Sequence, residues 1–531
     1  MLNINLQSRF STIVIGILIF FIPFFTFLSP ENLKQISGSE VFEIFLSLIF
    51  FLFFIFISSF SLELLSKLLF KKKIILFPFL CLAFYVIFLY IPYSTFLQEF
   101  LIKIFGESVM DPHNTFLTLS PLEGGFILFG LFCISLIVLG AKFNSFSLRA
   151  ILIFSIFMMI NALIPLVGYL IENTKINQAM SYEIKSSSLA QDKTLIKRNI
   201  YYIILDGMLA LDPAQNLSIA TKQDIIDNLS NSKLKYIDQS RSSYSGTYLT
   251  LASIMLMDYP VKPSSPKYFN TKNFFPRMMV QKKTELPLIS LLNRSNSSFF
   301  WSGNSWASCK SSNQWTCINS SYELVTRNLL MFYSSTPLLV IYNRIFNSFN
   351  LSSIDKFLNY IDKNGKPKTP FFAFIHHFSP HSPFLVTNEC GPTHSSKYFN
   401  RSFEGYKSSY NCVLKTIEMF MEKINILDPE AIVVFQGDHG WLNDKSHLLG
   451  SDLEFNEEEK YTLRGKIFNA IKAPEICFET YGLPRTNVNS IRFAVNCAYG
   501  FKLPYHQNIH YQSFYENDPQ YGIVIERNIY K

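Results

Sequence analysis

The stretch VVFQGDHGWL, residues 433 to 442, decides the fold of the C-terminal part of the chain. An apolar run from Ala431 leads into Asp438 and His439, two side chains that are costly to bury unless something pairs with them. Two further apolar runs end in polar residues, NIYYIILDG at 199–207 and PFFAFIHHF at 370–378. Such runs, alternating with helical patterns, are typical of a sheet that helices cover on both faces. We therefore predict an α/β domain with a mostly parallel central sheet.

One of the helices between these strands is well marked. From Tyr406 to Leu427, apolar residues recur at i, i+3, i+4 and i+7, which is the spacing of one helix face. The DP pair at 428–429 ends this pattern. We predict a long amphipathic helix before the third strand.

The ends of the three predicted strands carry a candidate metal site. Asp206 ends the first run, His381 follows the second by a few residues, and Asp438 and His439 end the third. Ligands of open α/β sheets bind beyond the carboxyl ends of the strands, so these side chains are expected to converge. Carboxylates and neutral imidazoles bind Zn²⁺ or Mn²⁺, with Mg²⁺ or Ca²⁺ as further possibilities. The alternative is a set of unrelated turn-forming acids and hydrogen-bonded core histidines.

A nucleophile is expected in the segment RSSYSGTYLTLASIMLMDYP, residues 241–260, where hydroxyl residues lead into a helical pattern. A hydroxyl at a helix start lies beside free backbone N–H groups, which favour a phosphate. Thr247 is best placed, and a bound metal would make its alkoxide accessible near neutral pH. Composition alone does not choose between Thr247, Ser245, Thr250 and Ser253. Ser245 or Thr247 could also serve only as a helix cap.

The first third of the chain has the composition of a membrane protein. Of the 531 residues, 49% are hydrophobic, 54 are Phe, and only 16% are charged, against roughly 25% in soluble domains. Five apolar stretches approach the ~20 residues that a spanning helix needs. They are 10–30, 44–62, 74–98, 124–141 and 150–171. We predict a transmembrane domain over 1–172, a linker over 173–198, and an extracytoplasmic catalytic domain over 199–531.

Basic residues in the short loops set the orientation. Lys and Arg gather before the first span, between the second and third, and between the fourth and fifth, which marks these sides as cytoplasmic. An odd number of spans then places everything after about Glu172 on the outer face. The net charge of +8 derives partly from these loops, and no Lys/Arg run beyond KKK at 71–73 occurs. We therefore expect no nucleic-acid partner.

Six cysteines follow the spans, an even number in a compartment that is predicted to be oxidising. Disulfides are expected, although six cysteines allow 15 pairings. Proximity favours Cys309–Cys317, Cys390–Cys412 and Cys477–Cys497, and scattered buried thiols are the alternative. A cysteine zinc site is disfavoured because no C-x-x-C pair occurs.

Four motifs together carry a family resemblance. YYIILDGM, SGTYLTLAS, FSPHSPF and VVFQGDHG follow one another in the order of the sulfatase-like branch of the alkaline phosphatase superfamily. With the preceding spans, the chain resembles the membrane phosphotransferases of that branch, the lipid A phosphoethanolamine transferases and lipoteichoic acid synthases. The resemblance covers the order of spans and most of 199 to about 505.

The resemblance implies roles for individual residues. Asp206, Thr247, Asp438 and His439 would bind the metal, and Thr247 would also be the nucleophile. His381 matches a histidine that contacts the phosphate or the leaving group. The resemblance also offers His447 as a second substrate-binding histidine, with a spacing that departs from the family pattern.

Two departures from related families bear on the reaction. The membrane transferases usually carry Glu where this chain has Asp206, as hydrolytic members do, so transfer and hydrolysis both stay open. The nucleophile segment lacks the C/S-x-P-x-R motif of sulfatases that mature a formylglycine. Sulfate-ester hydrolysis is therefore disfavoured.

The resemblance implies a metal-dependent phosphotransferase in a bacterial inner membrane, with its catalytic domain in the periplasm or another extracytoplasmic space. It would move a headgroup such as phosphoethanolamine or phosphoglycerol from a membrane lipid donor to an envelope glycan or lipid acceptor, through a phosphothreonine. We expect a monomer. The alternatives are a membrane-anchored phosphodiesterase or phosphatase that uses water as acceptor, and a catalytically silent envelope binding module.

Overall fold

The computed structural model of the chain divides into two compact units. The first comprises Met1–Ser181 with Ser321–Phe349, and the second comprises Tyr182–Ser320 with Asn350–Lys531. The structure describes residues 9–33, 38–70, 76–88, 144–179, 197–264, 286–303, 315–318, 332–333, 336, 353–367, 370–382, 384, 386–391, 402–441, 453–514, 520 and 522–530.

The described part of the first unit is built from apolar helices. They are α1 (Arg9–Phe27), α2 (Pro30–Leu33), α3 (Gly38–Phe70), α4 (Phe77–Ile87) and α7 (Asn144–Ala179). Three stretches are long and apolar enough to cross a membrane, namely Phe10–Phe27, Val41–Leu65 and Leu148–Val167. They agree with the first, second and fifth predicted spans. The shorter α4 falls within the third, and the fourth, 124–141, lies outside the described residues.

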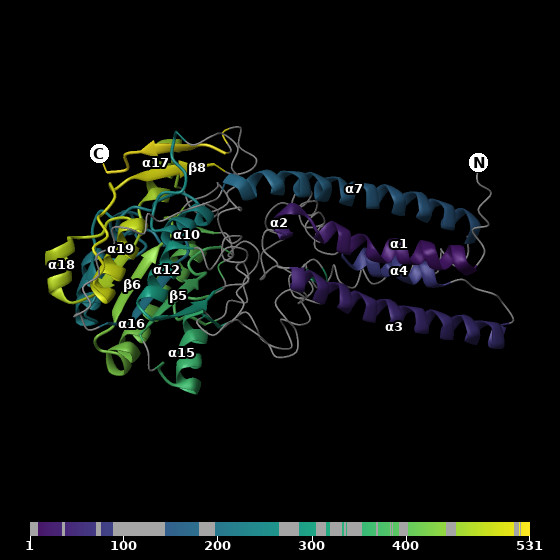
Figure 1. Ribbon diagram of the computed structural model, residues 1–531, viewed down its shortest axis with the longest axis horizontal. Coiled ribbons are helices and arrows are strands. Elements are labelled where there is room, and N and C mark those ends of the chain that lie inside the picture. Colours follow the sequence, from purple (N-terminus) through teal and green to yellow (C-terminus); the bar gives the residue numbers. More distant parts are fainter. Residues whose placement is uncertain are drawn as a thin grey trace. The chain divides into compact units, whose positions relative to one another are not determined.

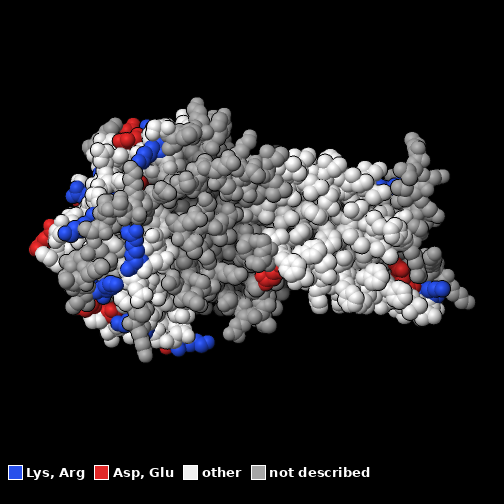
Figure 2. Space-filling view, viewed as in Figure 1, with Lys and Arg blue, Asp and Glu red and all other residues white. Residues whose placement is uncertain are grey.

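Many apolar side chains of these helices point away from the core of the unit. α1 packs against α4 and α7, whereas Phe50 and Phe53 of α3 and Ile153 of α7 are 68%, 62% and 70% exposed. Figure 2 shows that the described surface of these helices is almost free of charge. Soluble monomers rarely expose apolar surface of this extent, which suits helices that face lipid.

A later part of the chain joins the first unit. Phe332 is 3% exposed, and its ring lies 5.2 Å from that of Phe27 and 5.0 Å from that of Phe88. The hydroxyl of the neighbouring Tyr333 lies 3.3 Å from that of Ser47. These aromatic residues complete the core between the end of α1, the early part of α3 and the end of α4.

The second unit confirms the predicted α/β domain with a mostly parallel sheet (Figure 1). The strand order is β2-β7-β6-β1-β5-β3-β4, in which β6, β1, β5, β3 and β4 run parallel and β7 is antiparallel to β6 and β2. The strands are β1 (Ile200–Leu205), β2 (Lys235–Tyr236), β3 (Ser298–Ser302), β4 (Trp315–Ile318), β5 (Phe371–His377), β6 (Ile432–Gly437) and β7 (Asn469–Lys472). The three strands predicted from the sequence, β1, β5 and β6, are therefore adjacent at its centre.

Helices cover both faces of this sheet, which explains why β1 and β6 are buried along their whole length. On one face, Val413 and Ile417 of α16 (Phe403–Leu427) share a core with Tyr201 and Val433. This helix confirms the predicted 406–427 pattern and begins slightly earlier, where the Ser402 side chain accepts from Gly405 N–H. α15 (Ser353–Asn364) contributes Phe357 to the same core.

The other face is covered by α19 (Asn487–Tyr499), whose contacts with the sheet are partly polar. The Gln436 amide donates to the Ser490 hydroxyl at 2.9 Å, and the Tyr202 hydroxyl donates to Gln436 Oε1 at 2.9 Å. α10 (Thr247–Leu256) packs against both α19 and α12 (Pro287–Arg294). The remaining described elements are α8 (Leu211–Asn216), α9 (Lys222–Asn231), α17 (Glu457–Gly465), α18 (Glu475–Tyr481), β8 (His510–Ser513) and β9 (Val524–Arg527).

Two disulfides join described residues of the second unit. Cys390 pairs with Cys412, and Cys477 pairs with Cys497, which confirms two of the three pairs that proximity favoured. Cys309 of the third predicted pair lies outside the described residues.

Candidate metal centre

The ends of β1 and β6 place two aspartates side by side. The two strands run parallel with Leu205 opposite Gly437, so Asp206 and Asp438 are the next residue on each strand. Their exposed fractions are 1% and 0%, and that of His439 is 1%. The convergence of these residues follows directly from strand pairing.

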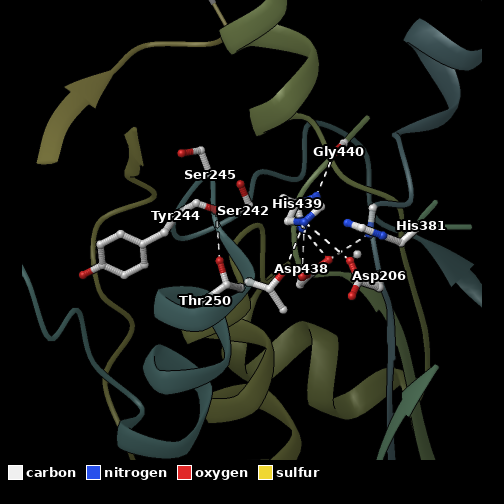
Figure 3. Close-up of polar contacts among 12 residues, drawn as sticks. Asp206, Ser242, Tyr244, Ser245, Thr250, His381, Asp438, His439 and Gly440 are labelled. Carbon is white, nitrogen blue, oxygen red and sulfur yellow. Dashed lines mark hydrogen bonds and ion pairs between the residues drawn. The ribbon is translucent and has the colours of Figure 1, made fainter. Parts of the chain in front are cut away.

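His439 lies at the centre of the cluster (Figure 3). Its Nε2 atom is 3.5 Å from Asp206 Oδ1, 3.5 Å from Asp438 Oδ2 and 3.1 Å from Thr247 Oγ1. Its Nδ1 atom lies 2.8 Å from the carbonyl oxygen of Gly440. A proton on Nδ1 satisfies that carbonyl, and this tautomer directs the Nε2 lone pair into the site.

The glycines of the two motifs allow close approach of backbone segments. A Cβ on Gly437 would lie 2.6 Å from the Met208 carbonyl oxygen, and one on Gly440 would collide with the carbonyls of Leu463 and Lys466. Gly207 has a φ of +76°, which suits glycine, and its N–H donates to Asp438 Oδ1 at 2.9 Å. The backbone N–H groups of Gly207 and His439 therefore fix the Asp438 carboxylate.

Thr247 is the first residue of α10, and the helix cap is Gly246 without a side-chain cap bond. Neither Ser245 nor Thr247 therefore acts as the helix cap. The Thr250 hydroxyl donates to the Tyr244 carbonyl at 2.9 Å, and the Ser253 hydroxyl donates to the Thr250 carbonyl at 2.7 Å. Of the four hydroxyls considered from the sequence, that of Thr247 is the one bonded to His439.

The loop before Thr247 is braced by distant parts of the chain. The Ser245 N–H donates to the Tyr511 carbonyl at 3.0 Å, and the Ser245 hydroxyl accepts from Ser513 N–H at 2.8 Å. On its other side, the buried Arg464 donates through Nε to the Ser245 carbonyl at 2.7 Å. β8 and α17 thus hold this loop in place, which the sequence did not indicate.

Two further histidines lie beside the carboxylates. The ring of His381 is 6.2 Å from that of His439, and Figure 3 shows His381 next to Asp206. His376 on β5 was not predicted as a site residue, yet its Nε2 atom is 3.3 Å from Asp206 Oδ2. His447 lies outside the described residues, and its role stays a prediction.

Burial and neighbouring charges set the ionisation of the cluster. Burial acts to raise the pKa of Asp206, but His381, His376 and His439 outweigh it and hold that pKa below its ordinary value. Burial, reinforced by the charge of Asp206, raises the pKa of Asp438 to about 6. Burial, with a further contribution from Arg464, holds the pKa of His439 well below its ordinary value. The imidazole of His439 is therefore neutral, as metal binding requires.

The donor set fits a divalent cation. Asp206, His376 and Asp438 each offer a ligand atom, and these atoms lie within 4.8 Å of one another. Asp206 Oδ1 and Asp438 Oδ2 are buried and accept no hydrogen bond from the described residues. Two such carboxylates are costly to bury without a counter-charge, and oxygen with imidazole nitrogen suits Zn²⁺ or Mn²⁺.

Several solved structures resemble the chain in fold. The C-terminal periplasmic domain of EcEptC from Escherichia coli has 10% identity and a TM-score of 0.41, covering 64% of this chain and 95% of that one. The integral membrane lipooligosaccharide phosphoethanolamine transferase A from Neisseria meningitidis has 12% identity and a TM-score of 0.35, covering 88% of this chain and 90% of that one. The lipoteichoic acid synthase LtaP from Listeria monocytogenes has 15% identity and a TM-score of 0.30, covering 54% and 69%. No curated protein matches the chain in sequence.

One family model matches part of the chain. Residues 233–463 match the Sulfatase family model. The matched range contains Thr247, His381, Asp438 and His439, and the structure adds Asp206 from β1 to the same cluster. This match agrees with the sulfatase-like resemblance drawn from the motifs: the part of the chain from 233 to 463, which follows the apolar N-terminal helices, is similar to the Sulfatase family.

Proposed function

We propose that the chain is a membrane-anchored, metal-dependent phosphotransferase that uses Thr247 as its nucleophile. It takes a phospho-headgroup, such as phosphoethanolamine or phosphoglycerol, from a lipid donor and passes it to an envelope glycan or lipid. The observation that carries this proposal is the contact of 3.1 Å between Thr247 Oγ1 and His439 Nε2, beside two buried carboxylates. A hydroxyl in that position can share a cation with Asp206, Asp438 and His439.

The bound cation would supply positive charge that favours the alkoxide of Thr247 and offsets charge on the phosphoryl group. The residues of the chain supply the geometry. Thr247 stands at the start of α10, where backbone N–H groups and the helix dipole favour a phosphate. His381 lies next to Asp206 and would hydrogen-bond a phosphoryl oxygen.

The proposed reaction has two balanced steps. The Thr247 oxygen bonds to phosphorus while the bond from phosphorus to the glyceride oxygen breaks, and the threonine proton ends on the released diacylglycerol. The acceptor hydroxyl then attacks the phosphothreonine, the Thr247–phosphorus bond breaks, and the acceptor proton returns to Thr247. With water as acceptor, the same residues would release the free phospho-headgroup, which is the hydrolase alternative that Asp206 keeps open.

The location is proposed from independent features. Among the described residues, three helices are long and apolar enough to span a membrane, and two disulfides join cysteines of the second unit. Disulfides form in oxidising compartments. We propose a bacterial inner-membrane protein whose second unit faces the periplasm or an equivalent outer space. Such an anchor would keep the nucleophile near lipid headgroups.

The test is intact-mass analysis of the full chain in detergent, incubated with phosphatidylethanolamine or phosphatidylglycerol. We expect a phosphoethanolamine or phosphoglycerol adduct on Thr247 together with released diacylglycerol. Thr247→Ala should lose both products, whereas Ser253→Ala, which removes a hydroxyl from the same helix, should keep them. Continued diacylglycerol release without an added acceptor would favour the hydrolase. Neither adduct nor diacylglycerol with any lipid donor would favour a silent binding module.

A further inference from the structure

His376 shares a face of the sheet with Asp206. In the parallel pairing of β1 and β5, His376 lies opposite Ile204, and paired residues project to the same side. Asp206 follows Ile204 by two residues, so it returns to that side, and its N–H donates to the His377 carbonyl at 3.0 Å. Strand pairing alone therefore puts the His376 imidazole beside the Asp206 carboxylate.

The distances suit shared binding of one ion. His376 Nε2 is 3.3 Å from Asp206 Oδ2. One ligand atom each of Asp206, His376 and Asp438 lie within 4.8 Å of one another. Bonds of about 2.0–2.2 Å to a zinc ion place neighbouring ligand atoms roughly 3–4 Å apart. His376 is 0% exposed, as are the Asp206 and Asp438 side chains to within 1%, so the three groups lie together inside the protein.

We infer that His376 is a further direct ligand of the divalent cation that this site binds, in addition to Asp206, Thr247, Asp438 and His439. This inference rests on the metal dependence of the proposed function, but not on the transfer reaction. An aspartate has a short side chain, so Asp206 holds a cation close to the strand ends, within reach of β5. The ion would then have two imidazole ligands, one from β5 and one from the segment after β6.

A different arrangement would place His376 behind the carboxylate. In that case His376 only donates a hydrogen bond to Asp206 and orients it, as outer-shell groups of metal sites commonly do. A His376→Gln variant distinguishes direct metal binding from hydrogen bonding to Asp206. The glutamine amide can still donate a hydrogen bond, but it is a much poorer zinc ligand than imidazole.

The experiment uses the full chain in detergent, stripped of metal with a chelator and titrated with Zn²⁺ and, separately, with Co²⁺. We expect His376→Gln to weaken Zn²⁺ binding at least about tenfold and to change the visible absorption of the Co²⁺ complex. His377→Gln is the matched control, since it replaces the next buried histidine, which projects to the other side of β5. It should leave both readouts unchanged.

A measurement on the unmutated protein makes the result independent of whether the variant folds. X-ray absorption of the wild-type zinc complex should show two imidazole ligands. A single imidazole, or unchanged Zn²⁺ affinity and Co²⁺ spectrum in a folded His376→Gln variant, would overturn the inference and leave the proposed function intact. Failure of the wild-type chain to bind Zn²⁺, Mn²⁺ or Co²⁺ would overturn both.

Discussion

The hydroxyl oxygen of Thr247 lies 3.1 Å from Nε2 of His439, although 192 residues separate them along the chain. The contact joins the start of α10 to the segment that follows β6, and both residues are buried. His439 cannot move away easily, because its backbone is held between Gly437 and Gly440, which admit no Cβ. The pair is therefore a fixed feature of the domain.

This geometry predicts that the Thr247 hydroxyl matters for reaction and little for stability. Thr247→Val keeps the shape of the side chain but removes its oxygen, so headgroup transfer should fall by a factor on the order of 10³ or more. Thr247→Ser keeps an oxygen at the same place and should retain part of the activity. Thermal unfolding of both variants should shift by no more than about 1 kcal/mol in unfolding free energy. Substantial transfer by Thr247→Val would contradict the assignment of the nucleophile.

The raised pKa of Asp438 predicts how metal binding depends on pH. In the metal-free protein this carboxyl holds its proton below pH about 6, because burial and Asp206 disfavour its charge. A cation must displace that proton, so Zn²⁺ affinity should fall by about tenfold per pH unit below about 6 and vary less above it. His439 adds no step in this range, because its pKa lies well below the ordinary value.

The raised pKa of Asp438 also predicts how the folding stability of the metal-free protein changes with pH. A carboxyl whose pKa is higher in the folded than in the unfolded state stabilises the metal-free fold at low pH, and this contribution is lost as pH rises through about 6. Added Zn²⁺ should restore stability above that pH by mass action. Thermal melts with and without Zn²⁺ between pH 5 and 8 measure this; a Zn²⁺ effect that is equal at both ends of the range would argue against Asp438 as a ligand.

The sequence predicted the parts of this site that local patterns specify. Asp206, Asp438 and His439 follow apolar runs, and an apolar run predicts a buried strand whatever its neighbours are. His376 was missed for the converse reason: its role depends on β5 lying next to β1, and strand order arises from long-range packing. The brace on Ser245 was missed as well, because β8 reaches it mainly through backbone groups that leave no pattern in the sequence.

The glycines of the GDHG motif predict a steric effect. Gly440→Ala would drive a Cβ into the backbone carbonyls of Leu463 and Lys466, which belong to the end of α17 and the turn after it. We expect a loss of roughly 2–4 kcal/mol in unfolding free energy, or failure to fold. Gly365→Ala is a control for steric contact, because a Cβ on Gly365 would meet nothing within 4 Å, so only the strain of its φ of +76° would remain. That variant should cost only about 1 kcal/mol. Equal losses in urea melts would show that steric contact at Gly440 is not decisive.

The brace on Ser245 predicts a change in catalysis that is separate from metal binding. The Ser245 hydroxyl accepts from Ser513 N–H at 2.8 Å and lies 3.1 Å from the Ser513 hydroxyl, two residues before the nucleophile. Ser245→Ala removes these bonds, so the loop before α10 gains freedom and Thr247 is held in its reactive position for less of the time. We expect kcat to fall about tenfold while KM and Zn²⁺ affinity stay near their wild-type values. Unfolding free energy should drop by about 1–2 kcal/mol, because the partly buried Ser513 N–H loses its acceptor.

Ser230→Ala is the control for Ser245→Ala, because it removes a serine hydroxyl that does not contact the loop before α10. Ser230 is exposed on α9, and its hydroxyl donates only to the Ile226 carbonyl one turn earlier. This variant should match the wild type in kcat, Zn²⁺ affinity and stability. If Ser245→Ala instead weakens Zn²⁺ binding as strongly as it lowers kcat, the loop positions the cation rather than the nucleophile. An unchanged kcat in Ser245→Ala would mean that the Tyr511 and Arg464 bonds to the Ser245 backbone hold Thr247 without the hydroxyl.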